Sequence, residues 1–157
     1  MNEKYDSKID TLEHKQTVAK LITEFCETML KRAVNHDNSK LDKVEKDLFD
    51  IETPVLKTLT YGTPEYKESL KRLGVALEHH YKHNSHHPEH YENGIDDMDI
   101  FDIVEMLFDW RAASLRHTDG DVLKSIEINK KRFNMSDQLV KIFENTAKKL
   151  NWGKSEK

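Results

Sequence analysis

Six of the nine histidines lie within twelve consecutive positions, from His79 to His90. Imidazole is the commonest metal ligand in proteins and titrates near neutral pH, so a neutral cluster of this kind attracts a cation and a protonated one repels itself. The spacing therefore indicates metal binding, with a solvated histidine-rich loop as the alternative. The six residues are His79, His80, His83, His86, His87 and His90.

Oxygen ligands are available elsewhere in the chain. His36 and Asp37 are adjacent, although this pair would equally suit a helix end followed by an Asp N-cap. Glu105 and Asp109 are four residues apart and share one face of the most apolar predicted helix, where a carboxylate needs a metal or a basic partner. Nitrogen and oxygen ligands without a thiolate suit Mn, Fe, Ni, Co or Zn, and their number predicts one or two divalent ions.

The position of His14 places a condition on its use as a ligand. It precedes His36 by 22 residues, which on one straight helix corresponds to a separation of about 33 Å. His14 can share an ion with His36 only if the chain reverses between them, most plausibly near residues 27–29. Otherwise it is a surface or core-edge histidine.

Composition narrows the functional classes. A chain of 157 residues can bury one sizeable core, so we expect a single domain over residues 1–150 and a flexible tail over 151–157. The lone Cys26 excludes an internal disulfide and a thiolate zinc finger. A net charge of −4 with dispersed Lys and Arg argues against general nucleic-acid binding. The absence of a long apolar run predicts neither a signal peptide nor a membrane span, and a cytoplasmic location.

The chain has only five glycines and three prolines, and its apolar residues recur at steps of three and four. This pattern predicts an all-α fold, a compact single-domain bundle of about six to seven helices. Thr63 with Pro64 marks a helix start, and Pro54 is expected to follow a helix end. The apolar stripes of the last two helices either close the core or form a homodimer face. The expected ranges are 8–26, 29–34, 41–51, 64–84, 99–117, 122–133 and 136–150, with Ile9, Leu12, Val18, Leu21, Ile22 and Phe25 of the first facing inward.

Three stretches of the sequence resemble motifs of a known family. His-Asp-Asn-Ser-Lys at 36–40 resembles the His-Asp-x-x-Lys signature of the HD superfamily of metal-dependent hydrolases, and residues 102–113 resemble its late helix ending in a metal-binding Asp. Asn-Ser-His-His-Pro-Glu at 84–89, together with Lys40 and Glu45, is similar to a pattern in small phage and bacterial HD-like proteins. This resemblance covers most of residues 10–148. The chain lacks the Gly-Tyr-Pro triplet of the HD-GYP branch, which argues against cyclic dinucleotide hydrolysis.

The resemblance implies roles for individual residues. The middle histidine of the superfamily pattern corresponds to His80 or His83, and Lys40 would face a phosphate. Arg116 would neutralise developing charge, and Glu105 or Glu45 would either orient a ligand histidine or act as acid and base. The implied metal ligands are His14, His36, Asp37, His80, His83, His86, His87 and Asp109.

The resemblance implies a metal-dependent phosphohydrolase whose partner is a small-molecule phosphate substrate, a nucleotide, attacked by a metal-activated water. The loop over residues 86–98 would form a wall of the pocket, and Tyr81, Tyr91 and Trp110 are candidates to stack on a base. Two alternatives remain open: an HD-type di-iron oxygenase, and a non-catalytic phage accessory protein that binds metal or a nucleotide.

Overall fold

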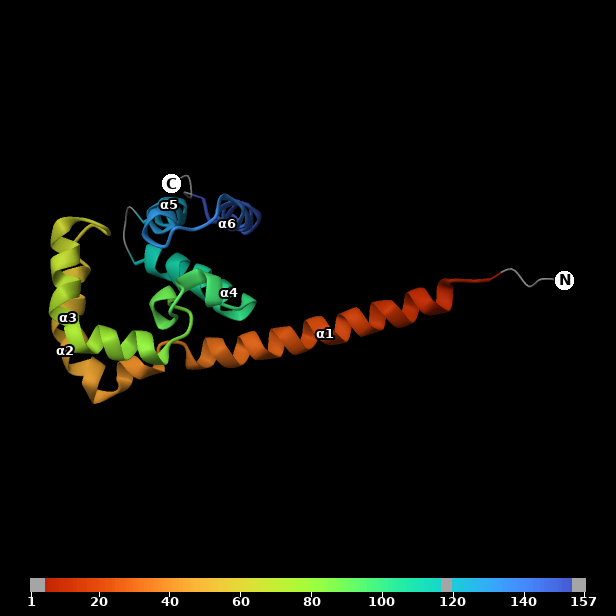
Figure 1. Ribbon diagram of the computed structural model, residues 1–157, viewed down its shortest axis with the longest axis horizontal. Helices are drawn as coiled ribbons and strands as arrows, with labels where there is room; N and C mark the ends of the chain where they lie inside the picture. Colours follow the sequence, from red (N-terminus) through yellow and green to blue (C-terminus); the bar gives the residue numbers. More distant parts are fainter. Residues whose placement is uncertain (1–4, 117–119, 154–157) are drawn as a thin grey trace. The chain divides into compact units, whose positions relative to one another are not determined.

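The computed structural model describes residues 5–116 and 120–153. Within these residues it contains six α-helices and three short 3-10 helices, so the predicted all-α class is confirmed (Figure 1). The chain divides into two compact units, Met1–His36 and Asp37–Lys157, which are described one at a time.

The first unit consists of one long helix, α1 (Lys8–Asn35). The apolar spacing predicted two helical pieces here. The structure joins them because residues 27–29 contain no Gly or Pro and the helical hydrogen bonds continue through them. None of the α1 residues is buried, which corrects the inward-facing prediction for its apolar residues. A unit made of a single helix has nothing within itself against which to bury an apolar stripe.

The second unit begins with a 3-10 turn, η1 (Asn38–Leu41), followed by α2 (Lys43–Leu56) and α3 (Pro64–His83), which pack against each other. The predicted start of α3 is confirmed, since the Thr63 side chain accepts a hydrogen bond from the Tyr66 amide. The predicted end of α2 was wrong, because Pro54 lies inside the helix. It is only two residues from the C-terminal end, where the single lost hydrogen bond would have reached the carbonyl of exposed Asp50.

Gly74 interrupts α3 with φ 41° and ψ −111°, a conformation that L side chains rarely adopt. We expect Gly74→Ala to destabilise the protein by about 2 kcal/mol, because the added Cβ disfavours this backbone even though no atom lies within contact distance of it. The midpoint of urea unfolding measures the effect. Val75→Ala, at the exposed neighbouring position, serves as the control and should be close to neutral. A Gly74→Ala protein as stable as the parent would show that α3 does not need this bend.

After α3 the chain makes two 3-10 turns, η2 (Pro88–His90) and η3 (Gly94–Asp97), before three further helices, α4 (Ile100–Ser114), α5 (Val122–Arg132) and α6 (Asp137–Lys149). Asp99 and Ser136 cap α4 and α6. The apolar stripes of α5 and α6 pack into the hydrophobic core and close it. This core contains Met106, Leu107, Val122, Ile126, Met135, Val140, Phe143 and Ala147.

The C-terminal end differs from the expected tail over residues 151–157. Trp152 packs against the core, and its backbone amide donates to the Ala147 carbonyl at 2.8 Å. Residues 154–157 lie outside the described residues. In the described part of the chain, no helix combines the length and apolar character needed to cross a membrane.

Candidate metal centre

Four side chains of the second unit converge on one point. Each of Asp37, His80, His86 and His87 offers one ligand atom, and these atoms all lie within 4.8 Å of one another. Asp37 comes from the turn before η1, His80 from the last turn of α3, and the two other histidines from the segment that follows α3. Three imidazoles and one carboxylate form a donor set suited to a divalent transition metal.

The individual distances fit a single ion. His80 Nε2 lies 2.9 Å from His87 Nε2 and 3.3 Å from Asp37 Oδ1. His86 Nε2 lies 3.6 Å from the same Asp37 oxygen. Bonds of about 2.1 Å in a tetrahedral arrangement place neighbouring ligand atoms about 3.4 Å apart. The cluster therefore has the dimensions of a metal site without rearrangement.

Glu45 on α2 determines the orientation of His80. Its side chain is fully buried, and its two oxygens lie 2.7 Å from His79 Nδ1 and 2.9 Å from His80 Nδ1. Burial raises the pKa of Glu45, but hydrogen bonds with His79, Ser39 and His80 outweigh it and hold that pKa below its usual value. A carboxylate can only accept, so both histidines donate their Nδ1–H to it. His80 is thereby held in the tautomer whose Nε2 lone pair faces the cluster.

Glu105 on α4 plays the same part for His86, with its Oε1 at 3.2 Å from His86 Nδ1. The Nε2 of this ring then presents a lone pair toward the Asp37 carboxylate. The His86 Nε2 lone pair and the Asp37 carboxylate are both acceptors, and a cation placed between them stabilises both. A carboxylate on the far nitrogen of a ligand histidine is the usual outer partner in metal sites, and both glutamates have the geometry of the orienting role.

His87 is held neutral by its surroundings. Burial, together with the nearby His86 and His80, lowers its pKa to about 3. Asp109 lies close enough for its charge to act on this ring, and one of its carboxylate oxygens is within 4.8 Å of one from Asp37. Neutral imidazole is the form that binds metals, and Asp109 adds a further oxygen ligand next to the cluster.

Residues of the two sequence motifs, at 36–40 and 84–89, hold the cluster together. Asp37 adopts the left-handed conformation with φ 58°, which Asp tolerates better than most residues. The Asn84 side chain donates to Ser39 Oγ at 2.7 Å and to the His80 carbonyl at 2.8 Å. The first motif is therefore fastened to the end of α3 by polar contacts between residues about 45 positions apart in the chain.

The segment carrying His86 and His87 is fastened to α4. Asp102 is buried at the start of this helix and accepts hydrogen bonds from Ser85 Oγ and from the Tyr91 hydroxyl, both at 2.6 Å. The same carboxylate completes the capping box with Asp99. The Tyr91 hydroxyl therefore helps to fasten this segment to α4, and stacking of its ring on a base stays a prediction.

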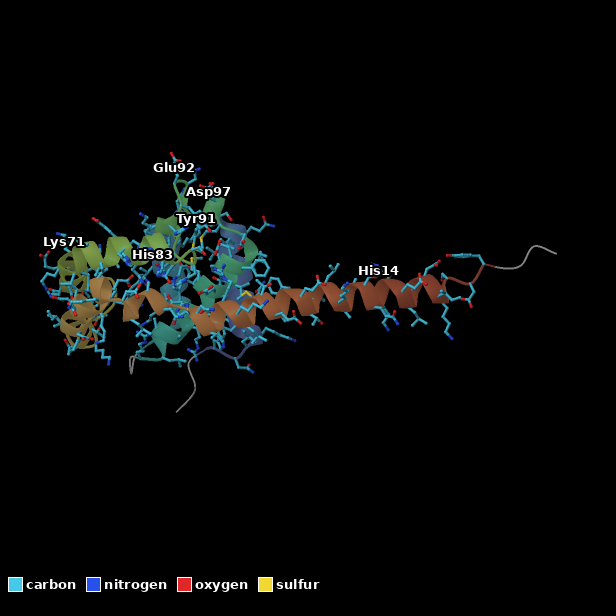
Figure 2. All side chains as sticks on the ribbon, turned by 90° about the horizontal axis from the view of Figure 1, so that it is seen from below. His14, Lys71, His83, Tyr91, Glu92 and Asp97 are labelled. Atoms are coloured by element: carbon cyan, nitrogen blue, oxygen red, sulfur yellow. The ribbon has the colours of Figure 1, made fainter. Side chains whose placement is uncertain are left out.

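Besides Asp109, three predicted ligands are not part of this cluster. His83 is exposed on α3 (Figure 2), and its Nδ1 donates to the His79 carbonyl at 2.8 Å, so of the two candidates only His80 lies in the cluster. His14 lies exposed in the N-terminal part of α1 (Figure 2). Because α1 is unbroken, the chain reversal needed for His14 to share an ion with His36 does not occur. His36 caps α1 and ends the first unit, and its role as a ligand stays a prediction.

The predicted cations take different positions. Lys40 Nζ lies 2.5 Å from Asp37 Oδ2 and pairs with this carboxylate, and its role toward a phosphate stays a prediction. Arg116 lines a cavity of about 580 Å³ that is also lined by His87 and Asp109. Tyr81 and Trp110 line the same cavity, as expected for residues that could contact a substrate.

Sequence reasoning missed three further basic residues of this cavity, Lys57, Lys124 and Arg132. Arg132 is paired with Glu89, with 2.5 Å between Nη2 and Oε1, across 43 positions of the chain. In the sequence it is one of three basic residues in the last turn of α5, where favourable interaction with the helix dipole accounts for it. Only its pairing with Glu89, which lies beside the cluster, distinguishes Arg132 from the other two basic residues of this turn.

Comparison with known proteins places the chain in a family. A profile described as "Family of unknown function (DUF5662)" matches residues 3–149, and the chain belongs to this family. No curated protein and no solved structure gives a significant match.

Proposed function

We propose that this member of the DUF5662 family is a metal-dependent phosphohydrolase, related to the HD superfamily, that hydrolyses a phosphate ester of a nucleotide. The proposal is carried by one observation, the convergence of Asp37, His80, His86 and His87 with Glu45 and Glu105 on the outer nitrogens of two of the rings. Outer carboxylates of this kind have a clear use in holding an ion and little use in a solvated histidine loop.

The ion would be held by these four residues, with Asp109 as an additional ligand. A divalent ion at this position supplies a bound water whose pKa is lowered to near neutrality. The protein residues supply the rest. Glu45 and Glu105 hold the rings in one tautomer, while Lys40 balances the charge of Asp37.

The cavity beside the cluster suits a phosphate ester. Four basic side chains line it: Lys57, Arg116, Lys124 and Arg132. Positive groups fixed in position before the substrate arrives stabilise the charge that develops on phosphoryl oxygens during hydrolysis. Aromatic residues on the same walls, among them Tyr81 and Trp110, offer faces against which a base can pack.

The test begins with metal content, measured by elemental analysis on protein purified without a histidine tag. We expect one or two equivalents of Mn, Fe, Ni, Co or Zn per chain, removed by a chelator. Hydrolysis of a panel of mononucleotides, followed as released phosphate, and of dinucleotides, followed as released mononucleotide, should stop in the stripped protein and return when metal is added back. Failure of every metal-loaded form to hydrolyse any ester in the panel would contradict the proposal, and binding without turnover would identify a metal-dependent nucleotide binder instead.

A further inference from the structure

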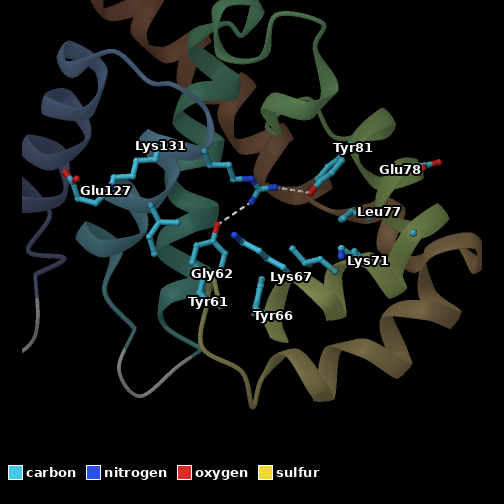
Figure 3. Close-up of a pocket in the computed structure, with 14 residues that line it drawn as sticks. Tyr61, Gly62, Tyr66, Lys67, Lys71, Leu77, Glu78, Tyr81, Glu127 and Lys131 are labelled. Carbon is cyan, nitrogen blue, oxygen red and sulfur yellow. Dashed lines mark hydrogen bonds between the residues drawn. The ribbon is translucent and has the colours of Figure 1, made fainter. Parts of the chain in front are cut away.

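Two hollows of the second unit adjoin each other. The first is the cavity beside the cluster, called here the metal-side cavity. The second is a groove of about 850 Å³ between α3 and α5, called here the outer groove (Figure 3). The residues common to both linings are Tyr61, Tyr66, Leu70, Tyr81, Ile128 and Arg132.

The shared boundary lies next to the metal centre. The ring of Tyr81 is 5.1 Å from that of His87, and Tyr81 directly follows the ligand His80 in α3. Arg132 reaches the hydroxyls of Tyr61 and Tyr81, both at 3.5 Å, while it pairs with Glu89. A phosphate at the metal centre would therefore have the metal-side cavity on one side and access to the outer groove past Tyr81 and Arg132.

The outer groove combines apolar and basic surfaces. Leu70, Leu77 and Ile128 provide apolar contact beside the tyrosine rings, and Lys67, Lys71 and Lys131 lie along the same walls. With Arg132 there are four basic side chains against the two acidic ones, Glu78 and Glu127. Figure 3 shows Lys67 and Lys71 on the α3 side and Lys131 on the α5 side. Such a lining favours a flat, weakly polar group attached to a negatively charged one.

The volumes of the two hollows also indicate the kind of ligand that they accommodate. A cavity of about 300–1,000 Å³ accommodates a complete small ligand, and each of the two hollows falls within this range. A mononucleotide would occupy one of them and leave the other to water. A ligand with two aromatic units joined through one phosphate would fill both.

Resting on the proposed function, we infer that the substrate is a dinucleotide, with one nucleoside in the metal-side cavity and the other in the outer groove. Its hydrolysis uses one water. The water oxygen forms a new bond to phosphorus, the bond between phosphorus and one nucleoside oxygen breaks, and the two water protons are divided between the released alcohol and the new phosphomonoester.

The test compares binding of two probes that resist hydrolysis, adenylyl-adenosine phosphorothioate and adenosine 5′-phosphorothioate, by calorimetry with the metal-loaded protein. We expect the dinucleotide to bind at least about tenfold more tightly, and the double variant Lys67→Glu, Lys71→Glu to remove this preference while leaving mononucleotide affinity unchanged. Lys141→Glu, Lys148→Glu is the matched control. Both residues are exposed on α6, which lines neither hollow, and Lys141 is paired with Glu144 three positions away as Lys71 is paired with Glu68.

Equal affinity for the two probes, or a preference that survives in the Lys67→Glu, Lys71→Glu variant, would overturn the inference. Inorganic phosphate as a third probe identifies binding by charge alone, and competition by phosphate as strong as that by the dinucleotide would also overturn it. The inference and the proposed function fail separately. Mononucleotide hydrolysis with equal probe affinities removes the inference only, and a dinucleotide preference without any turnover removes the proposed function only.

Discussion

Asp37→Ala should empty the metal centre and abolish hydrolysis of the phosphate ester while the helices remain folded. Asp37 is the only carboxylate within the four-residue cluster, and both His80 and His86 direct Nε2 toward its Oδ1. Its loss removes a ligand itself, so the effect should exceed the 10- to 100-fold reduction in metal affinity that follows loss of an orienting partner. Elemental analysis, chromatography of the hydrolysis products and far-ultraviolet circular dichroism measure the three expected outcomes.

Asp47→Ala is a suitable control for this experiment. Asp47 forms an ion pair with Lys43 within α2, much as Asp37 pairs with Lys40, but it is exposed. Removing it releases a lysine without touching the cluster, and metal content and activity should be unchanged. If Asp37→Ala keeps its full metal content, the convergence of these residues is structural and the proposed function loses its basis. The double variant Asp37→Ala, Asp109→Ala then reports whether Asp109 holds an ion alone.

Glu45→Gln should lower metal affinity by about 10- to 100-fold without removing a single ligand. The buried carboxylate accepts from two imidazoles at once, whereas a Gln amide has one oxygen to accept with and a nitrogen that must donate. One of the two histidines must then give up its present tautomer. When His80 does so, it places a proton on the Nε2 that faces the ion. Metal affinity by competition with a chromophoric chelator measures the change.

Glu52→Gln separates this effect from a general loss of stability. Glu52 is the other buried glutamate of α2, and it accepts hydrogen bonds from Ser69 and from Arg72 at 2.5–2.9 Å. Because it makes no contact with a ligand histidine, the variant should unfold at lower denaturant concentration and still bind metal normally. Wild-type metal affinity in Glu45→Gln would show that Glu45 supports packing and does not orient His80.

Several features of this protein follow from local sequence. Thr63 with Pro64, Asp99 and Ser136 begin helices in the sequence and in the structure, because a cap depends on hydrogen bonds between residues two or three positions apart. The all-α class follows equally from apolar spacing. Residue type also selected Asp37, His80, His86 and His87, since a cluster of imidazoles with carboxylates has few other uses.

The tertiary structure decided which members of that set meet. His79, His80 and His83 lie close together at the end of α3, and nothing in their spacing separates them; the position of Glu45 on α2 directs His80 inward, and His83 faces solvent. The same holds for Glu105, for Arg132 beside Glu89, and for the two adjoining hollows, each formed by residues far apart in the chain. Periodicity describes one helix at a time, whereas the orientation of a ligand and the walls of a cavity depend on how one helix packs against the next.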